Sequence, residues 1–290
     1  MYTRSISSKL FDCINDVFLT LLALTMIFPF YYVLIFSISN PNLLGSGLIL
    51  WPKGLNLESY SIIMEDSRVL HSILISVART VSGPVLMIAI TSMAAYAITR
   101  DTLPGVRFLR KFFVFTMYMG AGLIPMYLLV KELHLIGTFW IYIIPQAAAV
   151  YNMILIKTYI ESIPKSLEEA ALIDGANDFV LFWRILFPAC TPVIAATALF
   201  SAVGHWNDFM DTQIYNNMNP NLYTLQYMLY QILSSATSLA QAKNTLNRPT
   251  ATPQSLKMAV TMITILPIAA VYPFLQKHFA KGLLIGSIKG

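Results

Sequence analysis

Side chains able to carry out acid–base, nucleophilic or metal chemistry are few in this sequence, and their spacing matches no known catalytic pattern. Asp208 and Asp211 form a close carboxylate pair, which we interpret as a solvated pair in a loop rather than a general acid and base. The 4 histidines are scattered and no His-Glu-x-x-His sequence occurs, so a zinc site is not indicated. The sequence also lacks Gly-x-Ser-x-Gly and Gly-x-x-x-x-Gly-Lys-Ser/Thr, which argues against a serine hydrolase and a nucleotide-binding loop. We therefore expect no catalytic residue, metal or cofactor on this chain.

Polar residues instead concentrate in one short segment, residues 166–188, which reads SLEEAALIDGANDFVLFWRILFP and lies between two apolar runs. Ser166 and Glu169 match a capping box, which predicts that a helix begins at this serine. Gly175 stands where that helix would end, because glycine readily adopts the left-handed conformation of a helix C-terminus. The Asn-Asp pair that follows can cap a second helix over residues 179–187. The segment therefore predicts two short helices with a sharp bend between them, or, alternatively, an ordinary amphipathic loop covering a bundle.

The apolar runs on either side of this polar segment are long enough to cross a membrane. The 290 residues are 57% hydrophobic and 11% charged, whereas a soluble domain carries about 25% charged residues. Continuous apolar runs of about 20 residues favour membrane-spanning helices over the alternating strands of a barrel. We predict an all-α integral membrane protein in which residues 1–290 form one domain with six transmembrane helices. The predicted spans are 17–38, 72–99, 112–130, 138–156, 185–204 and 258–276, with a polar segment, 161–188, between the fourth and the fifth.

Basic residues predict the orientation of the spans. An even number of spans puts both termini on one side, and that side would hold 12 lysines and arginines against 6 on the other. Both termini and residues 161–188 are therefore predicted to be cytoplasmic. The first apolar run is too long for the core of a signal peptide, so we expect it to stay as a membrane anchor. The net charge of +5 reflects this bias and requires no nucleic-acid partner. The longest outer connection, 205–257, carries leucines at helical spacing over 222–233.

Arg79 is the only charged residue inside a predicted span. A charge at this depth is costly, so it either pairs with another group, snorkels to the interface, or faces a water-filled pathway. The sequence alone leaves these interpretations open.

The polar segment resembles the EAA loop of the permease subunits of ABC importers. That loop has Glu-Ala-Ala, three further residues and a glycine, followed later by Ile-x-x-Pro. Here it stands as Glu169-Ala170-Ala171-Leu172-Ile173-Asp174-Gly175-Ala176, closed by Ile185-Leu186-Phe187-Pro188. The resemblance covers essentially the whole chain and is to the carbohydrate-uptake group. Its further matching stretches are 49–60, 122–125, 145–152, 206–208 and the ending from Tyr272 to Gly290.

This resemblance implies a machine of several subunits. Such permeases work in pairs, which in the carbohydrate group are usually two different chains, over two cytoplasmic ATPase subunits, and a soluble binding protein delivers the sugar from outside. ATP and Mg²⁺ are then bound by the ATPase subunits, and this chain is a non-catalytic component of a bacterial cytoplasmic (inner) membrane. By position, the resemblance assigns contact with the ATPase to Glu168, Glu169, Ala170, Ala171, Asp174, Gly175, Ala176 and Pro188.

The resemblance also implies that the solute is a sugar or oligosaccharide, with acidic chains such as alginate fragments as the narrower expectation. As a pathway residue, Arg79 would favour an acidic saccharide. Asn152, Trp206 and Asn207 would supply the amide hydrogen bonds and the aromatic face that sugars need.

Two other functions stay open at this point. A permease for amino acids, metals or peptides shares the EAA loop but not this C-terminal sequence. A secondary transporter or channel would need carboxylates or a filter within its spans, and no Asp or Glu lies in any of the six runs.

Overall fold

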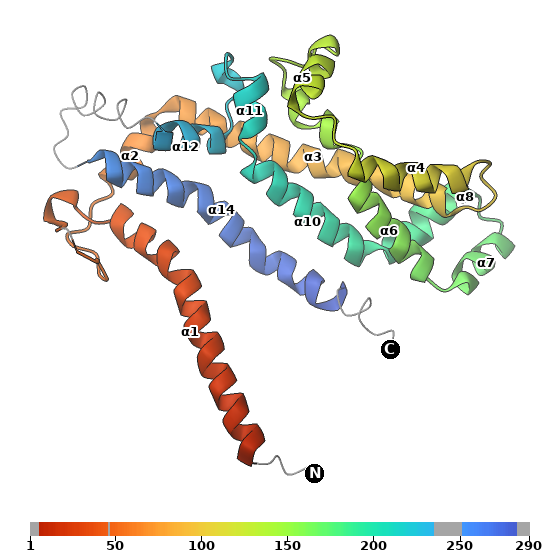
Figure 1. The fold of residues 1–290 in the computed structure, drawn as a ribbon, viewed down its shortest axis with the longest axis horizontal. Helices are drawn as coiled ribbons and strands as arrows, with labels where there is room; N and C mark the ends of the chain where they lie inside the picture. Colours follow the sequence, from red (N-terminus) through yellow and green to blue (C-terminus); the bar gives the residue numbers. More distant parts are fainter. Residues whose placement is uncertain (1–5, 46, 235–250, 283–290) are drawn as a thin grey trace. The chain divides into compact units, whose positions relative to one another are not determined.

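The computed structural model describes residues 6–45, 47–234 and 251–282, and most of these are helical (Figure 1). No named strand occurs among them, and the isolated β-bridge joins Ser39 to Leu55. The predicted all-α class is confirmed for these residues. The chain divides into two compact units, the first of residues 1–66 and 231–266 and the second of residues 67–230 and 267–290.

The first unit is held by a small apolar core and two serine contacts. Its core residues are Ile35, Phe36 and Ile49. Ser59 Oγ donates a hydrogen bond of 2.8 Å to Ser255 Oγ, which ties α2 to the beginning of α14. Its elements are α1 (Ile6–Ser37), η1 (Pro41–Leu43), α2 (Glu58–Glu65) and the first part of α14 (Pro253–Gly282).

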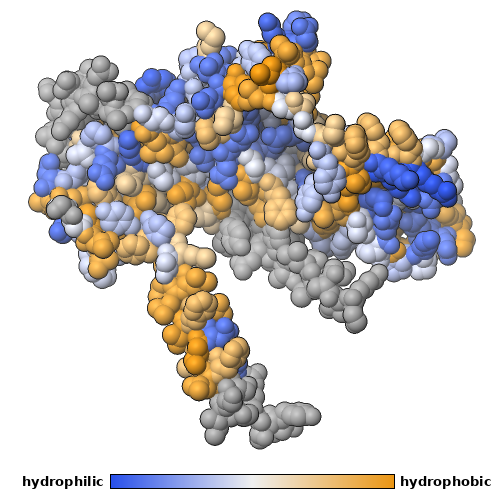
Figure 2. Space-filling model, in the orientation of Figure 1, coloured by the Kyte–Doolittle hydropathy of each residue, from blue (hydrophilic) through white to orange (hydrophobic). Residues whose placement is uncertain are grey.

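Helix α1 exposes apolar side chains along most of its length, which appear orange in Figure 2. Only 6% of its most apolar stretch, within Lys9–Ser37, is buried. Such a surface is stable only where the surroundings are also apolar, because water would have to be ordered around it. The helix passes through Pro29 without ending.

The second unit is organised around α3 (Ser67–Thr99), which packs against α10 and α6 (Figure 1). Towards the C-terminal end of α3, a core of buried residues joins α3, α6, α7 and η4, and it includes Ala95, Ile156, Ala171 and Leu181. This core positions the polar segment. The other elements are α4 (Val106–Tyr118), α5 (Leu123–Glu132), η2 (Phe139–Tyr142), η3 (Ile144–Gln146), α6 (Val150–Ser162), α7 (Lys165–Ile173), α8 (Asp178–Val180), η4 (Leu181–Leu186), α9 (Phe187–Ala189), α10 (Thr191–Asn207), α11 (Met210–Tyr215) and η5 (Pro220–Leu222).

Helices able to cross a membrane are of two kinds. Three are continuous, at Lys9–Ser37, Ser67–Thr99 and Pro253–Ala270. Three others are bent pairs, Val106–Tyr118 with Leu123–Glu132 (116°), Phe139–Gln146 with Val150–Ser162 (44°) and Asp178–Ala189 with Thr191–Asn207 (77°). Within the described ranges this gives three spanning helices, or up to six if each bent pair is one span.

The bends fall where the backbone cannot continue an ordinary helix. The predicted span 112–130 is interrupted after Tyr118, and Gly122 has a φ of +82°, a conformation that side-chain-bearing residues rarely adopt. The predicted span 185–204 bends near Cys190, between Pro188 and Pro192, each of which lacks the N–H that a continuous helix would use. These apolar runs are therefore not single straight helices.

The predicted outer connection, 205–257, contains helical structure. The predicted helix over 222–233 is confirmed as α12 (Leu225–Ser234), although Leu222 lies in the preceding 3₁₀ turn η5. Residues 235–250 of this connection and both chain ends, 1–5 and 283–290, lie outside the described residues. The prediction that both termini are cytoplasmic concerns these chain ends, and so does the last part of the C-terminal resemblance. Both therefore lie outside the described residues.

Candidate coupling segment and buried arginine network

The polar segment begins with a helix whose start differs from the prediction. Helix α7 starts at Lys165, with Pro164 as its N-cap, and no side chain caps it. The predicted capping box is therefore wrong, because Ser166 already lies inside the helix. Pro164 has a φ of −57° and a ψ of 127°, so the rigid proline ring sets the turn into the helix instead.

The end of α7 matches the prediction. Gly175 has a φ of +81°, and its N–H donates to the carbonyl of Leu172 at 3.1 Å. The N–H of Ala176 donates to the carbonyl of Ala171 at 3.0 Å. These two bonds form a Schellman motif, which satisfies the last carbonyls and stops the helix sharply.

A second helical stretch follows in three pieces. Asn177 caps α8 as predicted, since its side chain accepts from the N–H of Val180 at 2.9 Å. The turns of η4 then widen into a π-helix, and the N–H of Phe187 bonds to the carbonyl of Phe182. Pro188, in the first turn of α9, cannot donate to a carbonyl in the turn before it, which explains why the helix loosens there.

The predicted coupling residues do not all face the same environment. Glu169, Ala170, Asp174, Gly175 and Pro188 are exposed. Ala171 is only 7% exposed and belongs to the chain's own core, so its small size is explained by packing within this subunit. Five large apolar side chains are exposed on the same segment: Leu167, Leu172, Ile173, Phe179 and Trp183.

Glu168 is occupied within the chain. Its Oε2 accepts from Arg100 Nη1 at 2.6 Å, and the Arg100 guanidinium lies 4.3 Å from the centre of the Tyr96 ring. The Tyr96 hydroxyl in turn donates to Asp178 Oδ1 at 2.8 Å. The end of α3 and the residue that follows it are thereby joined to α7 and to α8. Sequence reasoning missed Tyr96 and Arg100, because their partners lie 82 and 68 positions away.

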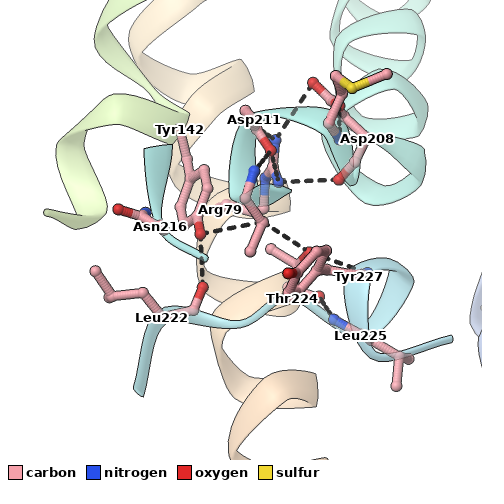
Figure 3. A network of polar contacts seen from close by, with 12 residues as sticks. Arg79, Tyr142, Asp208, Asp211, Asn216, Leu222, Thr224, Leu225 and Tyr227 are labelled. Carbon is pink, nitrogen blue, oxygen red and sulfur yellow. Dashed lines mark hydrogen bonds and ion pairs between the residues drawn. The ribbon is translucent and has the colours of Figure 1, made fainter. Parts of the chain in front are cut away.

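Arg79 is fully buried and paired, as Figure 3 shows. Its Nη1 and Nη2 donate to the two carboxylate oxygens of Asp211 at 3.1 and 2.6 Å. Nη1 also donates to the backbone carbonyl of Asp208 at 3.1 Å. The ring centre of Tyr142 lies 4.5 Å from the guanidinium carbon. Of the interpretations left open by the sequence, the structure supports a paired arginine.

This arrangement corrects the interpretation of the two aspartates. They are not a solvated pair, because the Asp211 side chain is only 13% exposed and both residues contact Arg79. Burial raises the pKa of the Asp211 carboxyl to about 6, since the loss of water outweighs the attraction of Arg79. The N–H of Thr212 also donates to this carboxylate, at 2.7 Å.

Further hydrogen bonds connect residues 208–225 to the elements around Arg79. The Tyr142 hydroxyl donates to the carbonyl of Leu222 at 2.6 Å, and the Thr212 hydroxyl donates to Tyr142 at 3.1 Å (Figure 3). On α3 itself, Ser76 Oγ accepts from the N–H of Leu225 at 2.8 Å. Residues 208–225 are thus held to the N-terminal half of α3 by side-chain contacts.

The four predicted pathway residues do not line one common cavity. Arg79 is enclosed, and Trp206 is 6% exposed and lines an apolar recess with Val77, Pro84 and Ala202. The Asn152 amide lies 3.5 Å from the sulfur of Met87. Asn207 is exposed and accepts a hydrogen bond from Gln226 at 3.2 Å.

His205 is a buried polar residue that sequence reasoning did not single out. It is 1% exposed, and a Cβ added to Gly83 would lie 2.2 Å from its Nε2. Glycine therefore permits the close approach of α3 and α10 at this point. Across the described ranges, no group of three or more His, Cys, Asp or Glu residues is placed to hold a metal ion.

Known proteins similar to this chain include members of one family of membrane transport proteins. The family described as "Binding-protein-dependent transport system inner membrane component" matches residues 105–285. Protein LplC of Bacillus subtilis (strain 168) is 38% identical over 285 residues, covering 98% of this chain and 96% of that protein. The polygalacturonan/rhamnogalacturonan transport system permease protein YtcP of the same organism is 36% identical, covering 98% and 99%. The crystal structure of a bacterial ABC transporter involved in the import of the acidic polysaccharide alginate contains a similar chain, with a TM-score of 0.88, 28% identity, and coverage of 96% of this chain and 100% of that one. The chain therefore belongs to the family of binding-protein-dependent transport system inner membrane components.

Proposed function

We propose that this chain is one permease subunit of an ATP-driven importer for acidic oligosaccharides. Two kinds of observation support the narrower substrate. One similar protein is named for polygalacturonan and rhamnogalacturonan transport, and the similar solved structure belongs to an importer of an acidic polysaccharide. An importer for a non-sugar solute, or a secondary transporter, is the alternative that the experiment below must exclude.

The observation that carries the coupling function is the shape and exposure of α7. The helix is short, ends sharply in a Schellman motif at Gly175, and is packed on the chain's core only through its Ala171 side. Its exposed residues include Glu169, Ala170 and Ile173. A stiff helix with a small, partly apolar exposed face suits a cleft on another protein.

The partner in this proposal is a cytoplasmic ATPase subunit. Glu169 makes a charged contact with it, Ala170 allows close approach, and Gly175 sets the bend that follows. ATP and Mg²⁺ are bound by two such ATPase subunits, and this chain binds neither. A second, non-identical permease and an external binding protein complete the assembly.

The membrane topology in this proposal is six spans with both termini in the cytoplasm. The three continuous helices and three bent pairs supply up to six crossings. The split of 12 basic residues against 6 supports a cytoplasmic side for α7 in this proposal. Asn152, Trp206 and Asn207 are the substrate-path residues of this proposal, with Trp206 and Asn207 towards the outer side, while the charge of Arg79 is compensated by Asp211 in this conformation.

The test is uptake by vesicles reconstituted with this chain, the second permease, the ATPase and the binding protein. We expect accumulation of an oligouronate against its gradient only when ATP and all four components are present. A neutral oligosaccharide of the same length and an amino acid mixture serve as controls. Accumulation by this chain without the ATPase would overturn the importer assignment, and equal uptake of the neutral sugar would overturn only the acidic substrate.

A further inference from the structure

Helix α3 carries two polar networks, one near each end. In its first half, Arg79 binds Asp211 and the carbonyl of Asp208. At its other end, Tyr96 and the adjoining Arg100 bind Asp178 and Glu168. We propose that Arg100 and Tyr96 are positioning residues that clamp the coupling segment to α3, so that a movement of α7 is transmitted along α3 to the outer network. This inference rests on the proposed function of α7.

The clamp contacts both arms of the bent segment. Arg100 Nη1 reaches Glu168 in α7 at 2.6 Å, and the Tyr96 hydroxyl reaches Asp178, the first residue of α8, at 2.8 Å. The Arg100 guanidinium also lies over the Tyr96 ring, 4.3 Å from its centre, so the two contacts support one another. Because the arms on both sides of the Gly175 bend are held to the same end of α3, the segment should move with α3 as one body.

The two glutamates at the start of α7 therefore have different roles. Glu169 is exposed and remains available to another protein. Glu168 has a side chain only 21% exposed and is engaged with Arg100. Glu169 is thus free to contact a partner, while Glu168 contacts the residue that follows α3. Transmission of a movement from a partner to α3 requires both kinds of contact.

Helix α3 is suited to carry a displacement across the membrane. It is continuous from Ser67 to Thr99. The 21 positions from Arg79 to Arg100 span about 31 Å at about 1.5 Å per residue, close to the roughly 30 Å of a bilayer core. The helix is also packed along its length against α10 and α6. The two networks consequently lie about one hydrocarbon thickness apart, at Arg79 within this continuous helix, which includes Pro84, and at its C-terminal end.

A structural ion pair and a clamp make different predictions. If the Arg100 contact only stabilises the fold, its removal should lower the amount of assembled complex, and the remaining complex should transport normally. If it transmits movement, the complex should still assemble and hydrolyse ATP, but each transported sugar should cost more ATP. The ratio of ATP hydrolysed to sugar transported separates these cases.

The experiment uses the complete complex in vesicles. The variants are Arg100→Gln, Glu168→Gln, Tyr96→Phe, and the charge exchange Arg100→Glu with Glu168→Arg. Tyr96→Phe keeps the ring beneath Arg100 and removes a single hydroxyl, so it tests the clamp even if Arg100→Gln assembles poorly. Asp101→Asn is the matched control, because it breaks the neighbouring ion pair to Arg110 at a side chain that is 86% exposed.

We expect Arg100→Gln and Glu168→Gln to raise the ATP-to-sugar ratio at least fivefold, and Tyr96→Phe to raise it about twofold. Co-purification of the ATPase should be unchanged, and the charge exchange should restore the ratio to within about twofold of wild type. An unchanged ratio in both Arg100→Gln and Tyr96→Phe would overturn the clamp. Failure of the wild-type chain to co-purify with the ATPase would instead overturn the proposed function itself.

Discussion

Two arginines on the central helix region of this protein are held in contrasting ways. Arg79 is fully buried and binds both oxygens of Asp211 together with a backbone carbonyl. Arg100 has a side chain 25% exposed and makes one ion pair, to Glu168, while its Nε and Nη2 have no hydrogen-bond partner among the described residues. The Arg79 site is thus a fully buried pair that engages both oxygens of one carboxylate, although the Arg79 Nε also has no partner among the described residues, whereas the Arg100 site is a single, partly exposed ion pair.

This difference indicates how the two ends of the second unit behave. Breaking a buried pair leaves a charge without water, which commonly costs about 3–5 kcal/mol, whereas an exposed pair contributes about 0–1 kcal/mol. The outer segment 208–225 should therefore stay attached to α3 under most conditions. The partly exposed Arg100–Glu168 contact should contribute less to stability than the buried pair.

Removing the Arg79 charge is expected to have the largest effect on stability. Arg79→Gln leaves the Asp211 carboxylate buried without its partner, so the free energy of unfolding should fall by about 3–5 kcal/mol. The measurement is thermal unfolding of the purified subunit in detergent. Adding Asp211→Asn to this variant should recover part of the loss, and Lys157→Gln, which breaks the exposed pair to Glu161, is the control. A loss no larger than that of the control would show that the outer pair is not the stronger one.

Adding a side-chain carbon at Gly83, next to His205, should also lower the free energy of unfolding. In Gly83→Ala the new Cβ would lie 2.2 Å from His205 Nε2, so α3 and α10 must move apart or the buried ring must turn. We expect a loss of about 1–3 kcal/mol in the same unfolding assay. Gly204→Ala, on α10 with open space around its Cβ, is the matched control and should be neutral or slightly stabilising. Equal behaviour of the two variants would contradict the close packing.

In the coupling segment, Gly175→Leu tests the bend rather than global stability. Its φ of +81° costs a leucine about 1–2 kcal/mol, which should distort the end of α7 while the spans still insert. Transport should fall about tenfold or more and ATPase association should weaken, as measured by vesicle uptake and co-purification. Gly45→Leu, in a loop with open space, should transport normally. Normal transport by Gly175→Leu would remove α7 from the coupling role.

The smallest expected effect is a pH dependence of stability that comes from the Asp211 carboxyl. Burial raises the pKa of Asp211 from 3.8 to about 6, so the folded protein binds an extra proton between these two values. The stability contributed by that protonation is fully present below pH 3.8 and is lost as the pH rises through about 6. Arg79, which lowers this pKa, and Asp208, which raises it, are the charged groups acting on the carboxyl.

The check is the unfolding midpoint in detergent between pH 4.5 and 7.5. The wild type should lose stability relative to Asp211→Asn across pH 5 to 7, and the difference should level off above pH 7. Asp101→Asn, at an exposed carboxylate, should follow the wild-type curve. Parallel curves for wild type and Asp211→Asn would mean that the outer carboxyl stays ionised throughout.

Several elements of the fold could be predicted because their causes are local. The helix ending at Gly175 and the Asn177 cap depend on a few neighbouring residues and were confirmed. The capping box at Ser166 failed although it is also a local pattern, because the N-cap is Pro164, two residues earlier, and the serine already lies inside the helix. Competing local signals are resolved only when the backbone path is known.

Apolar runs were harder to interpret than helix ends. Hydropathy measures whether a run suits lipid, and it does not measure whether the run is straight. Pro29 and Pro84 lie inside continuous helices, whereas the runs containing Gly122 and Pro188 are bent. Prolines thus occur in continuous as well as in bent helices, so residue type alone did not decide which runs bend.

The amino-acid sequence by itself determined that this protein is helical and apolar, that a polar segment interrupts it, and that this segment turns at a glycine, since these properties depend on residue type and short-range spacing. Only the tertiary structure decided that Arg79 binds Asp211, 132 positions away, and that Arg100 binds Glu168, 68 positions away. The physical reason is that a charge in a low-dielectric interior must find an opposite charge in space, and the sequence position of that partner is set by how the helices pack.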